Sequence, residues 1–97
     1  MSFNDNVYEL CKKIPKGKVS TYYEIARKLN TKAYRAVGNA LNKNKDLINI
    51  PCFKIVNKNG ELGGYALGLK EKIKRLEKER IEIENNKIDL KKYLHKF

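Results

Sequence analysis

Residues 19–42 read VSTYYEIARKLNTKAYRAVGNALN and contain two short helical patterns joined by a tight connection. Thr21 and Glu24 have the spacing of a capping box at the start of the first pattern. Its apolar positions recur at helical spacing: Tyr22, Ile25, Ala26 and Leu29. The second pattern runs from about Thr31 to Asn42, with a predicted buried stripe of Ala33, Ala36, Val37, Ala40 and Leu41. Two helices with a tight turn between them predict a helix-turn-helix.

Around this pair the sequence predicts further helices and a small β element. The predicted helices are Asp5–Ile14, Leu69–Arg80 and Leu90–Leu94. Ile50–Val56 is rich in β-branched residues and predicts a short extended segment, and Asn85-Asn86 predicts a small hairpin turn. We therefore expect a mainly α fold with a small β-hairpin element, a winged-helix-like helix-turn-helix domain that occupies residues 1–97.

The charge of the chain is strongly positive and unevenly placed. The 97 residues hold 22 Lys and Arg against 11 Asp and Glu, a net charge of +11. Lys12–Lys58 contains twelve of these cations and two acids, whereas Lys70–Phe97 interleaves ten cations with six acids. The second pattern is typical of a solvated helical surface. The first favours a polyanionic partner, with nucleic acid ahead of an anionic membrane surface or an acidic protein.

Several classes of protein are excluded by composition. No apolar run approaches the ~18 residues of a membrane span, and the N-terminus lacks the apolar core of a secretory signal. Two cysteines are too few for a disulfide scaffold, and one histidine leaves too few ligands for a zinc site. We expect a cytoplasmic or nucleoid-associated protein that is not secreted and binds no metal.

Cys52 has the context of a reactive thiol. It follows Ile50-Pro51 in the basic region, where nearby cations favour the thiolate. The alternative is a cysteine buried as a small apolar residue, which is the common role of an isolated cysteine. Cys11 lies on the apolar face of the first helix and takes that alternative.

Further motifs accompany Cys52 in a fixed order. They are Thr21-Tyr22, Arg35-Ala36-Val37-Gly38-Asn39-Ala40, Asn44, Ile50-Pro51-Cys52, and Asn59-Gly60 through Gly64-Tyr65. From about Asn6 to Arg80 this set resembles the C-terminal, DNA-binding and active-site domain of the O6-alkylguanine-DNA alkyltransferases. The family signature Pro-Cys-His-Arg-Val stands here as Pro51-Cys52-Phe53-Lys54-Ile55.

The resemblance implies a direct-reversal DNA repair protein. Such a protein binds double-stranded DNA containing O6-alkylguanine through the minor groove and flips the damaged base. Cys52 would then take the alkyl (methyl) group in a single turnover and keep it as a thioether. No cofactor is implied, and we expect a monomer.

The resemblance also assigns roles to individual residues. Beside Cys52, the catalytic set comprises Asn44, which braces the preceding loop, Glu79, the acid of a hydrogen-bonded relay, and Tyr22, which crowds the 3′ phosphate. The intercalating residue is Arg35, which could instead be a phosphate contact, and Tyr22 could instead be a core tyrosine. The DNA-binding set is Arg35, Tyr22, Thr21, Ala36, Gly38, Asn39 and Lys32. The lesion pocket is assigned to Tyr65, Gly64, Ala66, Leu67 and Phe53.

The sequence departs from the family at several of these positions. Phe53 replaces the relay histidine, so thiolate formation is expected to rely on local cations such as Lys54 or to be slower. Lys45 and Leu47 stand where the family favours prolines, and Leu67 is expected to narrow the pocket. The N-terminal domain of the family, with any zinc site carried there, is expected to be absent.

Three functions remain open at this point. We favour alkyl transfer to Cys52. The short form also resembles the alkyltransferase-like proteins, which bind O6-alkylguanine without transfer and recruit other repair, although those typically lack the cysteine. A winged-helix DNA-binding regulator, with Cys52 merely structural, would explain the charge and the helix pair but leave the ordered motifs to chance.

Overall fold

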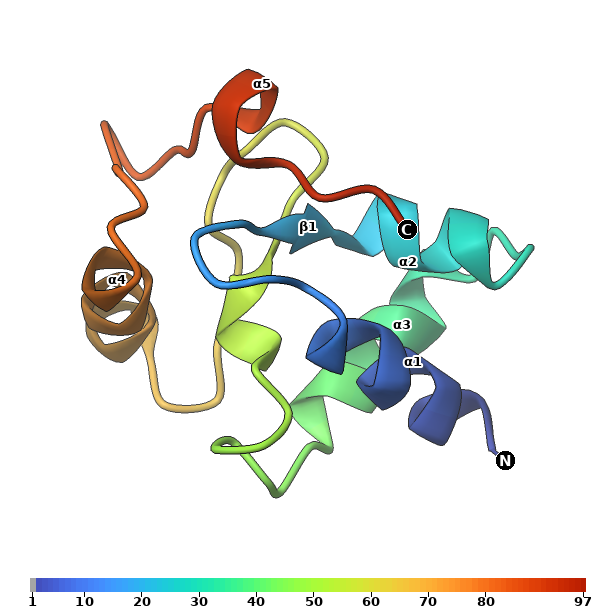
Figure 1. Cartoon of the computed structure of the whole chain (residues 1–97). Helices are drawn as coiled ribbons and strands as arrows, with labels where there is room; N and C mark the ends of the chain where they lie inside the picture. The colour runs from blue at the N-terminus through green and yellow to red at the C-terminus, as the bar shows by residue number, and fades with distance from the viewer. Residues whose placement is uncertain (1) are drawn as a thin grey trace.

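The computed structural model describes residues 2–97, which fold mainly into helices (Figure 1). The helices are α1 (Phe3–Lys12), α2 (Tyr22–Lys28), α3 (Tyr34–Asn42), α4 (Leu69–Lys78) and α5 (Leu90–Tyr93). The remaining elements are β1 (Ser20–Thr21), the 3₁₀ turn η1 (Cys52–Lys54) and β2 (Ile55–Val56). Within the described residues no helix is long and apolar enough to cross a membrane.

The predicted helix-turn-helix is formed by α2 and α3. The Thr21 hydroxyl accepts a hydrogen bond from the Glu24 backbone N–H at 3.0 Å, while the Glu24 carboxylate pairs with Arg27 at 2.9 Å. The helix therefore has the N-cap bond of the predicted capping box, whereas the Glu24 carboxylate that would complete the box pairs with Arg27 instead. A positive φ of 58° at Asn30 turns the chain toward α3. That helix begins at Tyr34 and exposes Ala33, so the stripe prediction is wrong for Ala33. Of the other residues in the predicted stripe, Ala36 is half-buried, and the buried ones are Val37, Ala40 and Leu41.

The structure has a small parallel sheet that was not predicted, in addition to the predicted hairpin turn. Strands β1 and β2 are parallel, with Ser20 opposite Ile55 and Thr21 opposite Val56. A hairpin joins neighbouring antiparallel strands, whereas these two lie far apart in the sequence. The predicted hairpin turn forms at Asn85-Asn86, where both φ angles are positive and Glu84 and Lys87 exchange two antiparallel backbone hydrogen bonds of 3.0 Å.

Two hydrophobic clusters meet at η1. The first joins α1 and α3 to Cys52 and Ile55. The second contains Val19, Phe53 and Val56 together with apolar residues of α4 and the C-terminal segment. Consecutive residues Cys52 and Phe53 thus face different clusters, which fixes the orientation of the thiol.

The C-terminal segment folds back over β1 and the loop after β2 (Figure 1). The backbone N–H of Val19 donates to Tyr93 O at 2.9 Å, and that of His95 donates to Val19 O at 2.7 Å. The N–H of Ile88 donates to Gly60 O at 2.9 Å. A Cβ atom at Gly60, where φ is 90°, would lie 2.5 Å from Ile88 O, so this close approach requires glycine.

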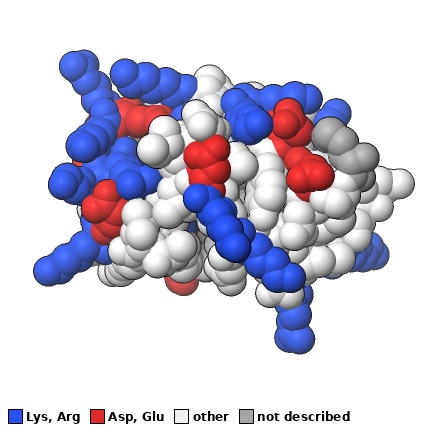
Figure 2. Space-filling model, turned by 90° about the horizontal axis from the view of Figure 1, so that it is seen from below, with Lys and Arg blue, Asp and Glu red and all other residues white. Residues whose placement is uncertain are grey.

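The charged helix α4 is not simply a solvated surface. Lys72 has no exposed surface, because it lies four residues before buried Leu76 on the same helix face. Arg75 is half-buried. On the face shown in Figure 2, lysines and arginines gather most densely at the left end with acids among them, and an acidic group and a basic side chain also lie across the centre. The expectation of a wholly solvated C-terminal third is therefore wrong for the two cations that face inward.

Candidate functional site

The Cys52 thiol is held by the loop that precedes it. The backbone N–H of Cys52 donates to Ile50 O at 2.8 Å. The Asn44 amide nitrogen Nδ2 donates to Ile50 O at 3.0 Å and to Cys52 Sγ at 3.4 Å. Its Oδ1 accepts from the Asp46 N–H at 2.9 Å. The buried Asn44 side chain therefore ties together both ends of the loop and donates directly to the sulfur.

The thiol lies in a small pocket that is almost closed. Its lining consists of Tyr22, Leu41, Asn42, Cys52, Gly64, Tyr65 and Ala66. The pocket volume is about 10 Å³, room for about one water molecule. Cys52 is 7% exposed. This volume is too small for a purine, so the pocket lining must rearrange before a base can reach the sulfur.

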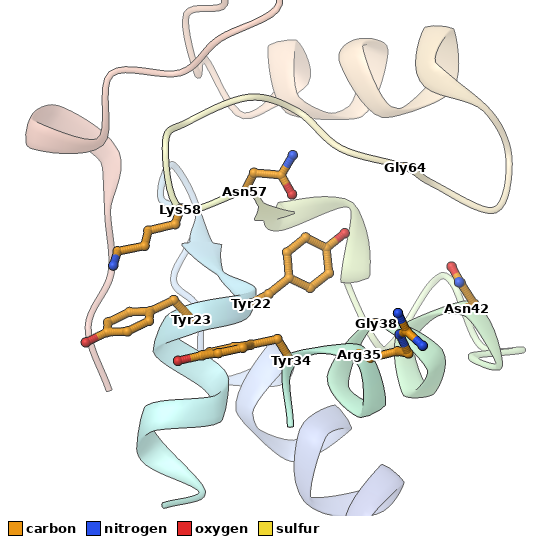
Figure 3. Close-up of a pocket in the computed structure, with 9 residues that line it drawn as sticks. All are labelled: Tyr22, Tyr23, Tyr34, Arg35, Gly38, Asn42, Asn57, Lys58 and Gly64. Atoms are coloured by element: carbon orange, nitrogen blue, oxygen red, sulfur yellow. The ribbon is translucent and has the colours of Figure 1, made fainter. Parts of the chain in front are cut away.

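A larger pocket opens beside the first on the α2–α3 face (Figure 3). Its volume is about 640 Å³ and it is lined by Tyr22, Tyr23, Tyr34, Arg35, Gly38, Asn42, Asn57, Lys58 and Gly64. Tyr22, Asn42 and Gly64 belong to the lining of both pockets. Any group that passes from the large pocket to the thiol must therefore pass these three residues.

Burial and polar contacts act on the thiol in opposite directions. Burial raises the pKa of Cys52 above its ordinary value and is the dominant influence. The hydrogen bond from Asn44 and the positive charges of Lys72 and Arg75 lower the pKa of Cys52. The cations that act on the sulfur come from α4, and Lys54 is not among them, contrary to prediction.

The buried side chain of Lys72 links strand β2 to the loop that lines the small pocket. Its ammonium donates to Ile55 O at 2.7 Å, to Gly64 O at 3.0 Å and to Leu62 O. Burial lowers the pKa of Lys72 to about 8. Lys72 was not predicted from the sequence, although its spacing of four residues from Leu76 indicates that both lie on the same helix face.

Lys54 and Glu79 pair with each other. Lys54 Nζ lies 2.8 Å from Glu79 Oε1 and also donates to Pro15 O at 3.0 Å. The same carboxylate oxygen accepts from the Gly17 N–H at 2.9 Å. The pair therefore fastens the end of α4 to the turn after α1. Phe53 lies in the second cluster and has no group that transfers a proton, so it does not link Glu79 to the thiol, as the loss of the relay histidine predicts.

The predicted lesion-pocket residues divide into two groups. Tyr65, Gly64 and Ala66 line the small pocket with Cys52. Phe53 and Leu67 do not: Phe53 is packed in the second cluster, and Leu67 is 51% exposed. Narrowing of the pocket by Leu67 is therefore not seen. The chain turns through positive φ at Gly63 and Gly68, which leaves Leu67 on the outside of the loop.

The predicted DNA contacts lie mostly on the α3 face. Arg35 and Gly38 line the large pocket, and Lys32 lines a neighbouring depression. Asn39 is exposed and Ala36 is half-buried. Thr21 does not belong to this surface: it is 2% exposed and its hydroxyl caps α2.

A stack of side chains beside Arg35 was missed in the sequence. The rings of Tyr23 and Tyr34 are 6.2 Å apart between centroids and nearly parallel at 19°. Lys58 Nζ lies 4.4 Å from the centroid of Tyr23 (Figure 3). The adjacent pair Tyr22-Tyr23 at the start of α2 was the available signal. The stack joins α2, α3 and the loop after β2 at the edge of the large pocket.

Comparison with known proteins places this site in a family. Residues 2–81 match the family model for the DNA-binding domain of 6-O-methylguanine DNA methyltransferase. The chain is 50% identical over 88 residues to a bifunctional methyltransferase/endonuclease of Picrophilus torridus, covering 90% of this chain and 30% of that protein. It is 43% identical over 83 residues to a methylated-DNA–protein-cysteine methyltransferase of Methanosarcina mazei, covering 82% and 52%.

A solved structure is similar over nearly the whole chain. S. pombe Atl1, in complex with damaged DNA containing O6-carboxymethylguanine, has a TM-score of 0.87 and 32% identity. The match covers 98% of this chain and 95% of Atl1. The chain thus spans about half or less of the length of the two curated relatives but nearly all of the structural neighbour. On the family match over residues 2–81, the similarity to the curated relatives and the fold, the chain belongs to the 6-O-methylguanine DNA methyltransferase family.

Proposed function

We propose that this protein repairs DNA by transferring an alkyl group from O6 of guanine to Cys52. The observation that carries the proposal is the position of the sulfur. It lies in the small pocket, which shares lining residues with the open pocket of the α2–α3 face, and Asn44 orients it. A cysteine that served only the core would need neither a hydrogen-bond donor at its sulfur nor a pocket.

Double-stranded DNA containing O6-alkylguanine is the proposed partner, bound through the minor groove. Support comes from Arg35, which is exposed in the first turn of α3, and from Gly38, which leaves open space on the same helix face. The narrow groove admits a helix face with small residues. Atl1 binds damaged DNA with the same fold. Arg35 would fill the gap left by the flipped base, and Tyr22 would crowd its phosphate.

The proposed reaction is a direct displacement. The Cys52 thiolate attacks the alkyl carbon, an S–C bond forms, and the C–O6 bond breaks with its electron pair left on guanine. The proton that the thiol lost is balanced by the proton that restored guanine gains at N1. The product is a thioether on Cys52, so each molecule acts once, and no cofactor takes part in the balance.

The same geometry supports a second candidate function, recognition without transfer. The small pocket is almost closed, burial raises the pKa of Cys52, and Phe53 removes the relay. Atl1, similar over 98% of this chain, is known in complex with DNA that contains O6-carboxymethylguanine. A protein of this kind would hold the lesion for other repair proteins.

One experiment separates these functions. The protein is incubated with a duplex containing O6-methylguanine, and the peptide that carries Cys52 is analysed by mass spectrometry, with Cys11→Ser as the control for the second thiol. Transfer predicts one added methyl group on that peptide. An unmodified peptide together with tight binding of the lesion contradicts transfer and supports recognition alone. Equal affinity for damaged and undamaged duplex contradicts both and favours a DNA-binding regulator.

A further inference from the structure

Arg75 of α4 joins three segments around the thiol. Its Nη1 donates to the Tyr65 hydroxyl at 2.9 Å and to Leu47 O at 3.3 Å, and its Nε donates to Glu71 Oε1 at 3.0 Å. Tyr65 lines the small pocket, and Leu47 lies in the loop between Asn44 and Cys52. The guanidinium therefore connects α4 to Tyr65 in the pocket lining and to the loop that precedes the thiol.

The loop before the thiol needs such a connection. It carries Lys45 and Leu47 in place of prolines, which would restrict the backbone before folding. Asn44 holds the ends of the loop, and Asp46 accepts a hydrogen bond from the Asn49 N–H at 3.0 Å within it. These bonds are internal to the loop. Arg75 instead anchors the carbonyl of Leu47 to a helix outside it.

The charge of Arg75 has a second effect. The positive guanidinium lowers the pKa of both Cys52 and Tyr65, against the effect of burial. Lys72 acts on Cys52 in the same direction, but its own pKa of about 8 means that it loses charge as the pH rises. An arginine stays charged throughout the range in which a thiol titrates. Arg75 is thus the cation that persists when the thiolate forms.

We propose that Arg75 is a positioning residue for Cys52: it fixes Tyr65 and the loop before the thiol, and it keeps a permanent positive charge beside the sulfur in place of the relay that Phe53 cannot form. Its part in alkyl transfer rests on the proposed function. Its effect on the thiol does not, because thiol reactivity is measurable without DNA.

The test is the pH profile of Cys52 alkylation by iodoacetamide, followed on the Cys52 peptide by mass spectrometry in a Cys11→Ser background. Arg75→Met removes the charge and the hydrogen bonds. We expect its profile to move to higher pH and its rate at neutral pH to fall about 3- to 10-fold. Arg75→Lys keeps a charge and should recover most of the neutral-pH rate. The matched control is Lys78→Met, an exposed cation of the same helix, whose profile should match that of the parent.

Two outcomes overturn the proposal: an Arg75→Met profile that superimposes on the parent, or a Lys78→Met profile that moves equally far. Circular dichroism checks folding, and if Arg75→Met does not fold, Arg75→Gln and Arg75→Lys provide the comparison. Methyl transfer from O6-methylguanine duplex is measured in parallel. A parent protein that transfers nothing, but whose Arg75 variants show the shifted profile, would contradict the proposed function and leave the role of Arg75 standing.

Discussion

Cys11 and Cys52 are free thiols of the same hydrophobic cluster in very different surroundings. Cys11 lies within α1 with no exposed surface, and burial raises its pKa to about 12. Cys52 is also buried, but Asn44 donates to its sulfur and two cations of α4 oppose the effect of burial. Burial alone therefore does not distinguish the surroundings of the two cysteines. Hydrogen-bond donors and charges at the sulfur do.

The largest expected effect comes from removing each thiol in turn. Cys52→Ser should abolish methyl transfer from O6-methylguanine duplex, because a serine hydroxyl in this site has no group to deprotonate it. Cys11→Ser should leave the rate of transfer unchanged. Transfer is measured as methyl bound to intact protein by mass spectrometry. Loss of transfer in Cys11→Ser, with the fold retained, would break the distinction between the two cysteines.

The second-largest effect is expected from replacing Asn44, which should change both stability and the reactivity of Cys52. Asn44→Ala removes the donor to Cys52 Sγ and one of the two donors to Ile50 O, and it leaves the Asp46 N–H without its acceptor. We expect the free energy of unfolding to fall by about 1–3 kcal/mol and alkylation of Cys52 to slow, as measured by denaturant titration and by iodoacetamide labelling. Asn39→Ala, on the exposed face of α3, is the control and should change neither. Unchanged labelling in Asn44→Ala would show that the sulfur does not depend on its donor.

The pH dependence of stability tests the buried cation. Because the pKa of folded Lys72 is about 8, below its ordinary value of 10.5, the unfolded chain binds more protons between these values. Stability contributed by Lys72 therefore rises with pH across that window, by up to about 3 kcal/mol. The free energy of unfolding of the parent and of Lys72→Met is measured from pH 7 to 10.5, and the difference between the two proteins is followed across this range. Both proteins contain the same two thiols, so the opposite contribution of the thiols cancels in the difference. A difference that does not change with pH would contradict the lowered pKa.

The smallest expected effect is that of Phe53→His on the rate of methyl transfer. A relay would require the new imidazole to reach Glu79, but that carboxylate is already paired with Lys54 and the Gly17 N–H. We expect no increase in the rate of methyl transfer and some loss of thermal stability, since the imidazole would replace a ring of the second cluster. A faster rate in Phe53→His would show that the Lys54–Glu79 pair opens to admit a relay.

Local patterns predicted the parts of the fold that are local. Thr21 caps α2 and the apolar spacing of α3 gives its buried face, because capping and helical periodicity depend on residues within one turn. The parallel pairing of β1 with β2 was not predictable from the same patterns. Each strand has two residues, and the two strands are separated in the sequence by the whole helix-turn-helix, the loop after α3 and η1.

The candidate site was predicted unevenly for a similar reason. Ordered motifs led to Cys52, Asn44 and Tyr65, which do lie together. Lys72 and Arg75 were overlooked because charge patterning treats interleaved lysines and acids as solvated, and only packing reveals which side of a helix faces inward. Likewise, pairing of Lys54 with Glu79 depends on a contact between η1 and the end of α4.

The tyrosines of the large pocket provide intrinsic fluorescence that can report ligand binding. The chain has six tyrosines and no tryptophan, so its intrinsic ultraviolet fluorescence comes from tyrosine. Tyr22, Tyr23 and Tyr34 all line the large pocket, and two of them are stacked (Figure 3). Emission should therefore be quenched when a ligand occupies this face. Ligand binding can therefore be titrated by fluorescence without a dye. Tyr34→Phe would show whether the Tyr34 ring contributes to the change in emission.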